Sequence, residues 1–226
     1  MNSAPNQQRE TIQMTINGRQ ITSQKGKNIL EICKETSIFI PTLCYDQRLE
    51  SYGGCRLCLV EIKGIARPLA SCTTPAENGM EVTTESELLT RLRKTTLSLI
   101  LSNHPNDCMC CDNAGDCSLQ ELAYLYNVKP GLYEGERWDK PIREDNPFIT
   151  YEPNKCILCG RCIRVCLEVQ GIGVFGYMYR KISEALATRC FDPFNPALPY
   201  RYRMRQVGYT VGTIFIRSYE QGERVY

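Results

Sequence analysis

The sequence predicts an α+β protein built from small modules, in which short strands precede two amphipathic helices and a cysteine-rich segment. Its 226 residues are enough for one large domain or two to three small ones, and 42% of them are hydrophobic. That share is below the usual one for a single well-buried core, so small metal-stabilised modules fit better. The patterns divide the chain into a first module, a helical segment, a connector and a last module, over residues 11–84, 85–128, 129–150 and 151–226.

The first module is expected to be a small mixed sheet crossed by one helix. Residues 11–24 read as two short strands around Asn17-Gly18, a dipeptide that is the strongest short-range signal for a hairpin. Residues 28–38 carry apolar side chains at mostly helical spacing, which places Cys33 in the core rather than at a ligand position. An irregular, glycine-bearing loop follows, and further short strands are expected within residues 59–64, 66–72 and 80–84.

Two helices are expected in the next segment. From Glu85 the apolar side chains recur near a period of 3.6, with Ser86 as a candidate N-cap, and the expected buried positions are Leu88, Leu89, Leu92, Thr96, Leu99 and Ile100. A shorter helix is expected over residues 118–128. The stretch after it is punctuated by proline and glycine and reads as a connector, and about the last forty residues show no clear period.

Composition narrows the cellular setting and the partners. The 14 cysteines would suggest disulfides in a secreted chain, but the first residues have neither a basic nor an apolar region of the signal-peptide kind. We therefore expect a cytoplasmic protein, peripheral to the inner membrane only through its partners, whose clustered cysteines bind metal. No apolar stretch approaches the ~20 residues that cross a bilayer. A net charge of +2 with interspersed signs gives no case for nucleic acid.

Four cysteines form the first candidate ligand set. A long loop rimmed by Gly53 and Gly54 delivers the thiolates, and glycine lets the backbone approach inorganic sulfide closely and donate N–H groups to it. Such a set suits a binuclear iron–sulfur centre. A structural zinc ion also takes four thiolates, but it usually uses two short C-x2–4-C pairs, and this set has one. The spacing is C-x10-C-x2-C-x13-C, and the members are Cys44, Cys55, Cys58 and Cys72.

The second candidate set combines three cysteines with the only histidine of the chain. A lone histidine is usually not a ligand, but this one stands just past a predicted helix, and Pro105 stiffens the turn toward the cysteines. Cys110 lies between two of the ligands and would compete with them, although adjacent cysteines rarely reach the same metal. The spacing is H-x3-C-x2-C-x5-C, and the members are His104, Cys108, Cys111 and Cys117.

The third candidate set has the spacing C-x2-C-x2-C-x3-C, which is that of one half of a bacterial two-cluster ferredoxin. In such a half, three thiolates hold one four-iron cluster and the fourth cysteine reaches a second cluster, so a partner run is expected. The chain has no second run, and spacing alone therefore does not identify a fourth ligand for the first three cysteines. The members are Cys156, Cys159, Cys162 and Cys166.

The three sets and the segments NHPNDCMCCDNAGDCSLQELA and KCILCGRCIRVCLEVQG, in this order, resemble the amino-terminal iron–sulfur region of the large iron–sulfur subunit of respiratory complex I. That region also opens iron-only hydrogenases and NAD-linked formate dehydrogenases and forms the small diaphorase subunit of NAD-reducing hydrogenases. The resemblance covers about residues 11–180. It implies a ferredoxin-like β-grasp with a [2Fe–2S] centre, a [4Fe–4S] centre with one histidine and three cysteine ligands, and a ferredoxin-like module with a further [4Fe–4S] centre.

The function that the resemblance implies is electron relay between a flavin-containing, NADH-oxidising subunit and a catalytic subunit such as a hydrogenase or formate dehydrogenase. On this reading the chain catalyses no reaction alone. Thiolate-bound iron suits a relay, because ligand type and hydrogen bonding tune its potential across ~1 V. Two other readings stay open at this point: an amino-terminal fragment of a longer catalytic oxidoreductase, and a zinc-bound scaffold without redox chemistry.

By the same resemblance, the fourth ligand of the third centre would be a later cysteine in a Cys-Pro-Val-Gly context. The nearest match is YTVGTIF, in which Tyr209 and Thr210 stand where Cys-Pro is expected. Three alternatives remain: ligation by Cys190, which is the only cysteine after Cys166; an incomplete or absent centre; and a ligand supplied by Cys166 or by a partner. We expect this centre to be the most labile of the three.

One glycine pattern imitates a nucleotide site. GIGVFG satisfies G-x-G-x-x-G through Gly171, Gly173 and Gly176, and Asp192 lies near the offset of a ribose-binding acid. A dinucleotide fingerprint must join a strand to a helix, whereas this pattern follows a cysteine-ligand segment. We therefore expect no nucleotide binding here, and the chain should not oxidise NADH alone.

Overall fold

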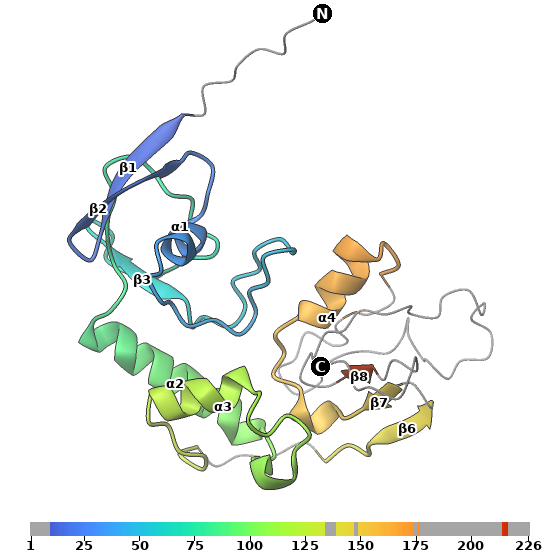
Figure 1. Cartoon of the computed structure of the whole chain (residues 1–226). Coiled ribbons are helices and arrows are strands. Elements are labelled where there is room, and N and C mark those ends of the chain that lie inside the picture. Colours follow the sequence, from blue (N-terminus) through green and yellow to red (C-terminus); the bar gives the residue numbers. More distant parts are fainter. Residues whose placement is uncertain (1–9, 134–138, 147–148, 174–175, 177–213, 217–226) are drawn as a thin grey trace, which may run out of the picture. The chain divides into compact units, whose positions relative to one another are not determined.

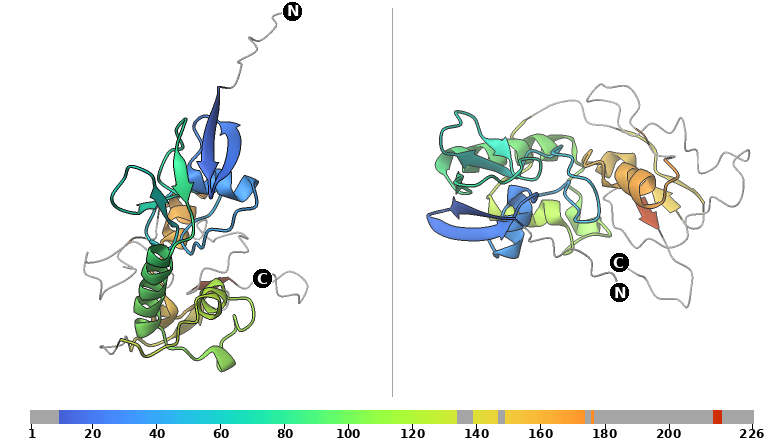
Figure 2. Two further views of the ribbon diagram at one scale, coloured as in Figure 1. Left: turned by 90° about the vertical axis from the view of Figure 1, so that its left-hand side faces the viewer. Right: turned by 90° about the horizontal axis from the view of Figure 1, so that it is seen from above.

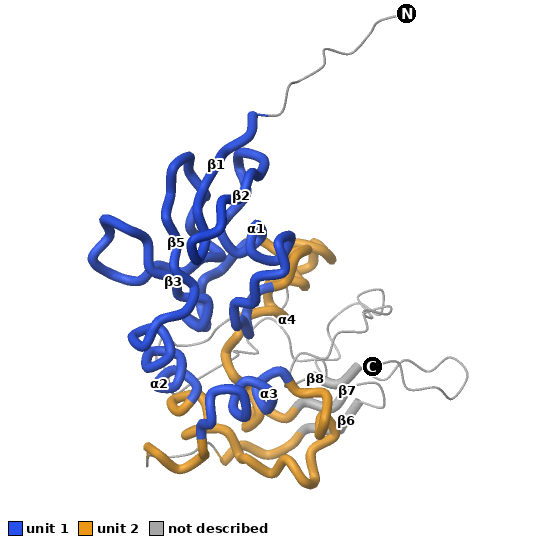
Figure 3. The backbone as a smooth tube through the Cα atoms, turned by 60° about the vertical axis from the view of Figure 1, so that its left-hand side comes forward, with its two compact units in different colours: residues 1–45, 51–97, 118–128 blue, residues 46–50, 98–117, 129–226 orange. Residues whose placement is uncertain are grey.

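The computed structural model describes residues 10–133, 139–146, 149–173, 176 and 214–216 (Figure 1). Two compact units are distinguished, shown in different colours in Figure 3. The first comprises residues 1–45, 51–97 and 118–128, and the second comprises residues 46–50, 98–117 and 129–226. In the described part of the chain, no helix combines the length and the apolar character that a membrane crossing requires.

The first unit is built on a mixed sheet with the strand order β2-β1-β5-β3-β4. The predicted hairpin is present, because β1 (Thr11–Ile16) pairs antiparallel with β2 (Arg19–Gln24) and both turn residues, Asn17 and Gly18, have positive φ. The three further strands predicted from the sequence are confirmed as β3 (Leu59–Ile62), β4 (Leu69–Ala70) and β5 (Glu81–Thr83). β5 pairs parallel with β1 and antiparallel with β3, and β3 pairs antiparallel with β4.

The helix α1 (Ile29–Glu35) packs on this sheet and closes the core of the unit (Figure 2). It begins in a capping box, in which the Asn28 side chain accepts from the Glu31 N–H over 2.9 Å and the Glu31 carboxylate accepts from the Asn28 N–H over 3.0 Å. Its buried face carries isoleucine and leucine together with Cys33, which is fully buried as predicted. Burial raises the pKa of the Cys33 thiol to about 11, so this thiol stays protonated at neutral pH.

The helices α2 (Glu87–Asn103) and α3 (Ser118–Leu125) also agree with the sequence. Ser86 caps α2, because its Oγ accepts from the Leu89 N–H over 3.2 Å. The buried face of α2 differs from the prediction, however, since Leu99 is 55% exposed while Arg93 is 2% exposed between the fully buried Leu89 and Leu97. The charged side chain of Arg93, which has partners inside the protein, therefore lies on the buried face of α2, where the periodicity predicts only apolar residues.

The second unit contains a three-stranded antiparallel sheet and several single helical turns. The strands β6 (Arg143–Asn146), β7 (Ile149–Tyr151) and β8 (Ile214–Ile216) lie in the order β6-β7-β8. β6 falls in the segment that was read as a connector, and β8 in the tail without a period, because strands of three or four residues are too short to show one. The turns are η1 (Cys108–Cys110), η2 (Pro153–Lys155), α4 (Arg161–Arg164) and the π-helical η3 (Val165–Val169).

Candidate metal centres

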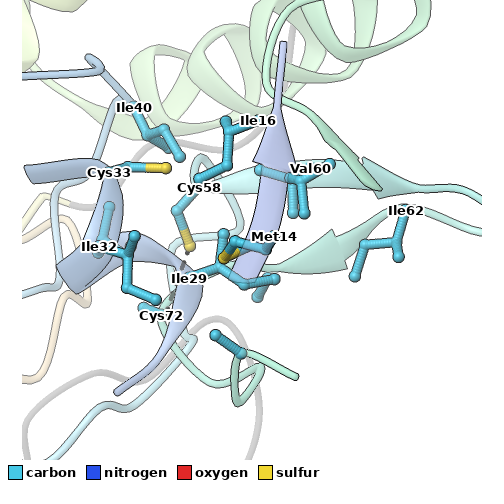
Figure 4. Close-up of a cluster of buried hydrophobic side chains, with 14 of the residues drawn as sticks. Met14, Ile16, Ile29, Ile32, Cys33, Ile40, Cys58, Val60, Ile62 and Cys72 are labelled. Carbon is cyan, nitrogen blue, oxygen red and sulfur yellow. Dashed lines mark hydrogen bonds between the residues drawn. The ribbon is translucent and has the colours of Figure 1, made fainter. Parts of the chain in front are cut away.

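All members of the first ligand set lie in the first unit, on the loop between α1 and β3 and just after β4. Cys44, Cys58 and Cys72 are each 1% exposed, and Cys55 is half-buried. Cys58 and Cys72 belong to the apolar core itself, where they pack among the side chains of β1, α1 and β3 (Figure 4). The packing of the sheet and α1 therefore positions these two cysteines.

The sulfurs of the first set form two pairs. Cys58 Sγ lies 3.4 Å from Cys72 Sγ, the contact dashed in Figure 4. In the other pair, the Cys55 N–H donates to Cys44 Sγ over 3.4 Å, and the two thiols also hydrogen-bond to each other. A binuclear centre takes four thiolates, two on each iron, and two sulfur pairs provide this donor set.

Within each pair, the thiols hold their protons unequally. The hydrogen bond from Cys44 lowers the pKa of Cys55 to about 5, and that from Cys72 lowers the pKa of Cys58 to about 7. The pKa values of Cys44 and Cys72 are raised, because each of these thiols keeps its proton in that bond and is buried. One proton per pair is thus already weakly held, and iron, which binds thiolates, would displace the other.

The loop before Cys55 needs glycine, as the sequence predicted. Gly53 is buried with φ of +66°, and a Cβ on it would lie 3.1 Å from the Thr73 Cγ2 atom, next to Cys72. A Cβ on Gly54 would meet the Tyr52 ring at 2.2 Å. These two positions let the backbone pass close to the sulfur pairs.

Arg93 supports the same site, and the sequence analysis missed it. Its guanidinium donates to the carbonyl oxygens of Leu57 at 3.2 Å, of Leu59 at 2.8 Å and of Thr84 at 2.9 Å. Because Leu57 and Leu59 flank Cys58, these bonds fix the backbone on both sides of a candidate ligand. The available signal was a charged residue in the apolar stripe between Leu89 and Leu97, where burial demands specific partners.

The second set lies in the second unit, on the turns between α2 and α3. Cys108, Cys111 and Cys117 are half-buried, whereas Cys110 is exposed. The backbone hydrogen bonds of this stretch each join residues three apart: for example, the Cys111 N–H donates to the Cys108 carbonyl over 3.4 Å, and the Ala114 N–H to the Cys111 carbonyl over 3.0 Å. The geometry is that of consecutive turns rather than of a packed element.

His104 follows the end of α2 and is half-buried. Burial lowers the pKa of its imidazole, Asp107 raises it and Lys155 lowers it, so the net direction is downward and the neutral ring is favoured. Its Nδ1 atom accepts from the Asn106 N–H over 3.3 Å, which places the ring proton on Nε2.

In the third set, Cys156 directly follows η2, Cys159 lies on the turn before α4, and Cys162 lies in α4. Leu158 and Gly160 have φ of 56° and 68°, and this left-handed backbone curls the chain between Cys156 and Cys162. Burial, and then the neighbouring Cys159 and Cys156, raise the pKa of the Cys162 thiol to about 12.

Cys166 is fully buried in η3, whereas Cys190, Tyr209, Thr210 and Asp192 lie outside the described residues. GIGVFG follows the helical turn η3 and not a strand. Among the described residues, no three His, Cys, Asp or Glu side chains converge closely enough to hold a single metal ion.

Charged side chains join the second and third sets inside the second unit. The Lys155 ammonium lies 2.9 Å from Glu152 Oε2 and 3.6 Å from Asp107 Oδ2, and its side chain is 10% exposed. Because Asp107 precedes Cys108 and Lys155 precedes Cys156, this pair connects the two ligand segments. No local pattern predicts this pair, since the two residues are distant along the chain.

A second ionic cluster holds residues 46–50 against α4. Asp46 forms a bidentate pair with Arg48, with 2.7 Å between Arg48 Nη2 and Asp46 Oδ2, and Arg161 Nη2 lies 3.4 Å from the same oxygen. The Glu50 N–H also donates to Glu168 Oε2 over 2.8 Å, and Arg164 donates to the Glu50 carbonyl. Residues just past Cys44 are therefore anchored to the element that carries Cys162.

Models of known families match three consecutive parts of the chain. A 2Fe-2S iron-sulfur cluster binding domain matches residues 9–87, and the NADH-ubiquinone oxidoreductase-G iron-sulfur binding region matches residues 93–130. The ferredoxin-like domain of NADH-quinone oxidoreductase subunit 3 matches residues 146–195. The chain therefore contains domains of the 2Fe–2S and 4Fe–4S types, in the order that the ligand sets predicted.

Relatives of known function are similar over most of the chain. The alpha subunit of an NADPH-Fe(3+) oxidoreductase of Geobacter sulfurreducens is 38% identical over 184 residues, which cover 81% of this chain and 22% of that protein. The mitochondrial 78 kDa subunit of NADH-ubiquinone oxidoreductase of Neurospora crassa is 33% identical over 221 residues, covering 90% of this chain and 30% of that protein. The chain thus spans less than a third of the length of these relatives.

A solved structure is similar over nearly its full length. One chain in the crystal structure of NAD+-reducing [NiFe]-hydrogenase in the H2-reduced state aligns with a TM-score of 0.79 and 30% identity. The alignment covers 94% of this chain and 90% of that one. Both the fold and the length of this chain therefore have a counterpart in that complex.

Proposed function

Because the chain belongs to the family of iron–sulfur subunits that includes the large iron–sulfur subunit of complex I and a chain of NAD+-reducing [NiFe]-hydrogenase, we propose that it relays single electrons between an NADH-oxidising flavin subunit and a catalytic subunit such as a hydrogenase. The carrying observation is the succession of three ligand sets within three matched iron–sulfur domains. Iron–sulfur centres bound there would exchange one electron at a time, at potentials set by their ligands and surroundings.

The proposal assigns each ligand set to one centre. The first set would hold a [2Fe–2S] centre through its two sulfur pairs, and the second a [4Fe–4S] centre through one imidazole and three thiolates. The third would hold a further [4Fe–4S] centre through three cysteines and a ligand that the described residues do not identify. The residues are Cys44, Cys55, Cys58 and Cys72; His104, Cys108, Cys111 and Cys117; and Cys156, Cys159 and Cys162.

The direct test is replacement of Cys58 by Ala in the full chain, purified without oxygen and reduced with dithionite. We expect the [2Fe–2S] signal in electron paramagnetic resonance to be lost and the four-iron signals to be kept, since only the first ligand set loses a sulfur. Cys33→Ala is the matched control: this thiol is equally buried in the same core but has no predicted ligand role, so every signal should remain. Survival of all signals in Cys58→Ala would refute the assignment.

Occupancy of the third set is tested by counting iron and acid-labile sulfide per chain. About ten irons would mean that both four-iron centres are complete, whereas about six would mean that the third set is empty. The colour of the same sample distinguishes an iron–sulfur protein from a zinc-bound scaffold, because an iron–sulfur protein is brown and bleaches with dithionite, whereas a zinc protein is colourless.

A second candidate function is that of an electron-entry segment of a longer catalytic chain. The coverage of 22% and 30% of two curated relatives favours it, whereas the coverage of 90% of the hydrogenase chain favours a separate subunit. The mass of the native polypeptide, together with mass spectrometry of copurifying proteins, distinguishes the two. A native polypeptide near 25.8 kDa that copurifies with a flavoprotein supports the relay subunit.

A further inference from the structure

Ser71, which directly precedes Cys72, is a buried polar residue that the ligand assignment does not use. It is fully buried, and its hydroxyl makes no full hydrogen bond to any described residue. Both of its backbone groups are engaged: the Ser71 N–H donates to the Cys58 carbonyl over 2.9 Å, and the Ser71 carbonyl accepts from the Leu30 N–H over 3.2 Å. The backbone of Ser71 is thus held in place. Its hydroxyl is buried without a hydrogen-bond partner in the described part of the chain, which costs free energy, and it can still donate.

The pairing of β3 with β4 determines what this hydroxyl faces. Leu59 pairs with Ala70 in an antiparallel register, so one further step along the two strands sets Cys58 opposite Ser71. Residues directly opposite in an antiparallel pair project their side chains to the same face, with Cβ atoms about 4.5–5.5 Å apart. The Ser71 side chain therefore projects to the same face of the strand pair as the Cys58 side chain, and the bond from the Ser71 N–H to the Cys58 carbonyl holds the two residues in this register.

We propose that Ser71 is a positioning residue of the first centre, whose hydroxyl donates to the Cys58 sulfur and thereby makes the centre easier to reduce. The inference rests on the proposed function, because it needs a centre at Cys58. Reduction adds one negative charge to the ligand sulfurs and irons, and an O–H donor to a ligand sulfur stabilises the charge that results. The effect of this hydroxyl on the potential should be large, because Cys58 and Ser71 are both buried. In the protein interior the dielectric constant is low, so the O–H dipole acts strongly on the nearby charge.

The test is a redox titration of the full, iron-loaded chain, followed by the [2Fe–2S] signal in electron paramagnetic resonance. Ser71→Ala removes only the hydroxyl, so the centre should still assemble and its midpoint potential should become more negative. We expect its ratio of reduced to oxidised form at a fixed ambient potential to fall about tenfold, which is about 59 mV for one electron. A pulsed measurement after exchange into D2O should also show the loss of one exchangeable proton coupling.

Ser23 provides the matched control. It is 9% exposed, its hydroxyl also lacks a hydrogen-bond partner among the described residues, and it lies on β2, at the opposite edge of the sheet from β4. Ser23→Ala should leave the potential and the proton coupling unchanged, and Ser71→Thr, which keeps a hydroxyl, should stay close to the wild-type potential.

The outcomes separate this inference from the proposed function. A wild-type [2Fe–2S] signal whose potential is the same in Ser71→Ala overturns the role of Ser71 and leaves the relay intact. An equal shift in Ser23→Ala also overturns it, because the effect would then come from any cavity in the unit. A wild-type chain without a [2Fe–2S] signal would refute the first centre and this inference together.

Discussion

The first and second ligand sets are supported by the protein in different ways. In the first set, Cys58 and Cys72 are core residues of a five-stranded sheet, and an internal arginine holds the carbonyls on both sides of Cys58. In the second set, the three cysteines are half-buried and stand on single turns. The sheet brings Cys58 and Cys72 within 3.4 Å of each other, whereas the second set stands on turns whose arrangement we expect bound iron to hold.

Two candidate sites with the same number of ligands can therefore depend on bound iron to different degrees for their local structure. The core of the first unit buries fifteen hydrophobic or cysteine side chains, and each large apolar residue contributes about 1.5–3 kcal/mol. The turns of residues 108–117 have no comparable core, because Met109 is 97% exposed and Cys110 is exposed. Metal binding supplies folding free energy where the chain itself supplies little.

The largest expected effect follows from removing iron with an anaerobic chelator. Amide hydrogen exchange read by mass spectrometry should show that residues 11–24 and 59–62 stay protected, because their strand hydrogen bonds do not involve ligands. Residues 108–117 and 156–166 should exchange at nearly the rate of an unfolded chain. Equal loss of protection in both regions would show that the sheet also depends on its centre, and the comparison would fail.

Arg93 allows the internal support of the first set to be broken without touching a ligand. Arg93→Met leaves three buried carbonyls without their donor, and bonds to a charged donor are worth roughly 1.5–3 kcal/mol each. We expect a loss of about 3 kcal/mol or more in the free energy of unfolding of the first unit, measured by urea titration of the [2Fe–2S] absorbance. Arg91→Met is the control, because Arg91 is exposed on the same helix and should cost little. A similar urea midpoint for the two variants would contradict the role of Arg93.

The sequence predicted the strands and helices of the first unit because their signals are local. Asn17-Gly18 specifies a tight hairpin by its backbone conformation, and Ser86 caps α2 through a bond to Leu89, three residues on. It failed for the buried face of α2, where Arg93 is buried and Leu99 exposed, because the partners of the guanidinium are carbonyls distant in sequence. Propensity and periodicity carry no information about such partners.

The candidate sites show the same division. Spacing grouped the cysteines of each candidate set, whose role as ligands stays a prediction, and glycine marked the close backbone approach at Gly53. Spacing did not reveal that Cys58 faces Cys72, because this contact depends on the antiparallel pairing of β3 with β4. Nor did it reveal Ser71, Asp46 or Lys155, whose significance arises only when strands and turns are brought together.

At the second set, the prediction concerns His104, a candidate ligand on a turn where a histidine can be exchanged for a cysteine. His104→Cys should keep a four-iron centre but make its potential more negative, because a thiolate brings a negative charge that imidazole lacks. A redox titration should show at least a tenfold lower ratio of reduced to oxidised centre at a fixed ambient potential, or about 59 mV. Cys110→Ala, which removes an exposed neighbour, should leave the potential unchanged. An unchanged potential in His104→Cys would mean that this residue is not a ligand.

The smallest effect is expected at Asp46, where the second unit does have a buried polar contact of its own. The bond from Arg48, with a smaller contribution from Arg161, holds the pKa of Asp46 well below its usual value of 3.8. A lowered pKa in the folded state means that the stabilisation is fully present above pH 3.8 and is lost as the pH falls below it. Because the Asp46 side chain is 7% exposed but that of Arg48 is 44% exposed, solvent screening limits the contribution to about 1 kcal/mol.

Asp46→Asn should therefore lower the stability of the second unit by this amount equally at pH 7 and pH 5, in urea titrations followed by the absorbance of the four-iron centres. After stopped-flow acidification to about pH 3, the difference in unfolding rate between the variant and the wild type should be smaller than at pH 5, because the stabilisation is lost progressively below pH 3.8. Glu50→Gln is the control, because Glu50 takes part through its backbone. A deficit in Asp46→Asn that persists unchanged at the low pH would show that the carboxylate charge is not what anchors residues 46–50.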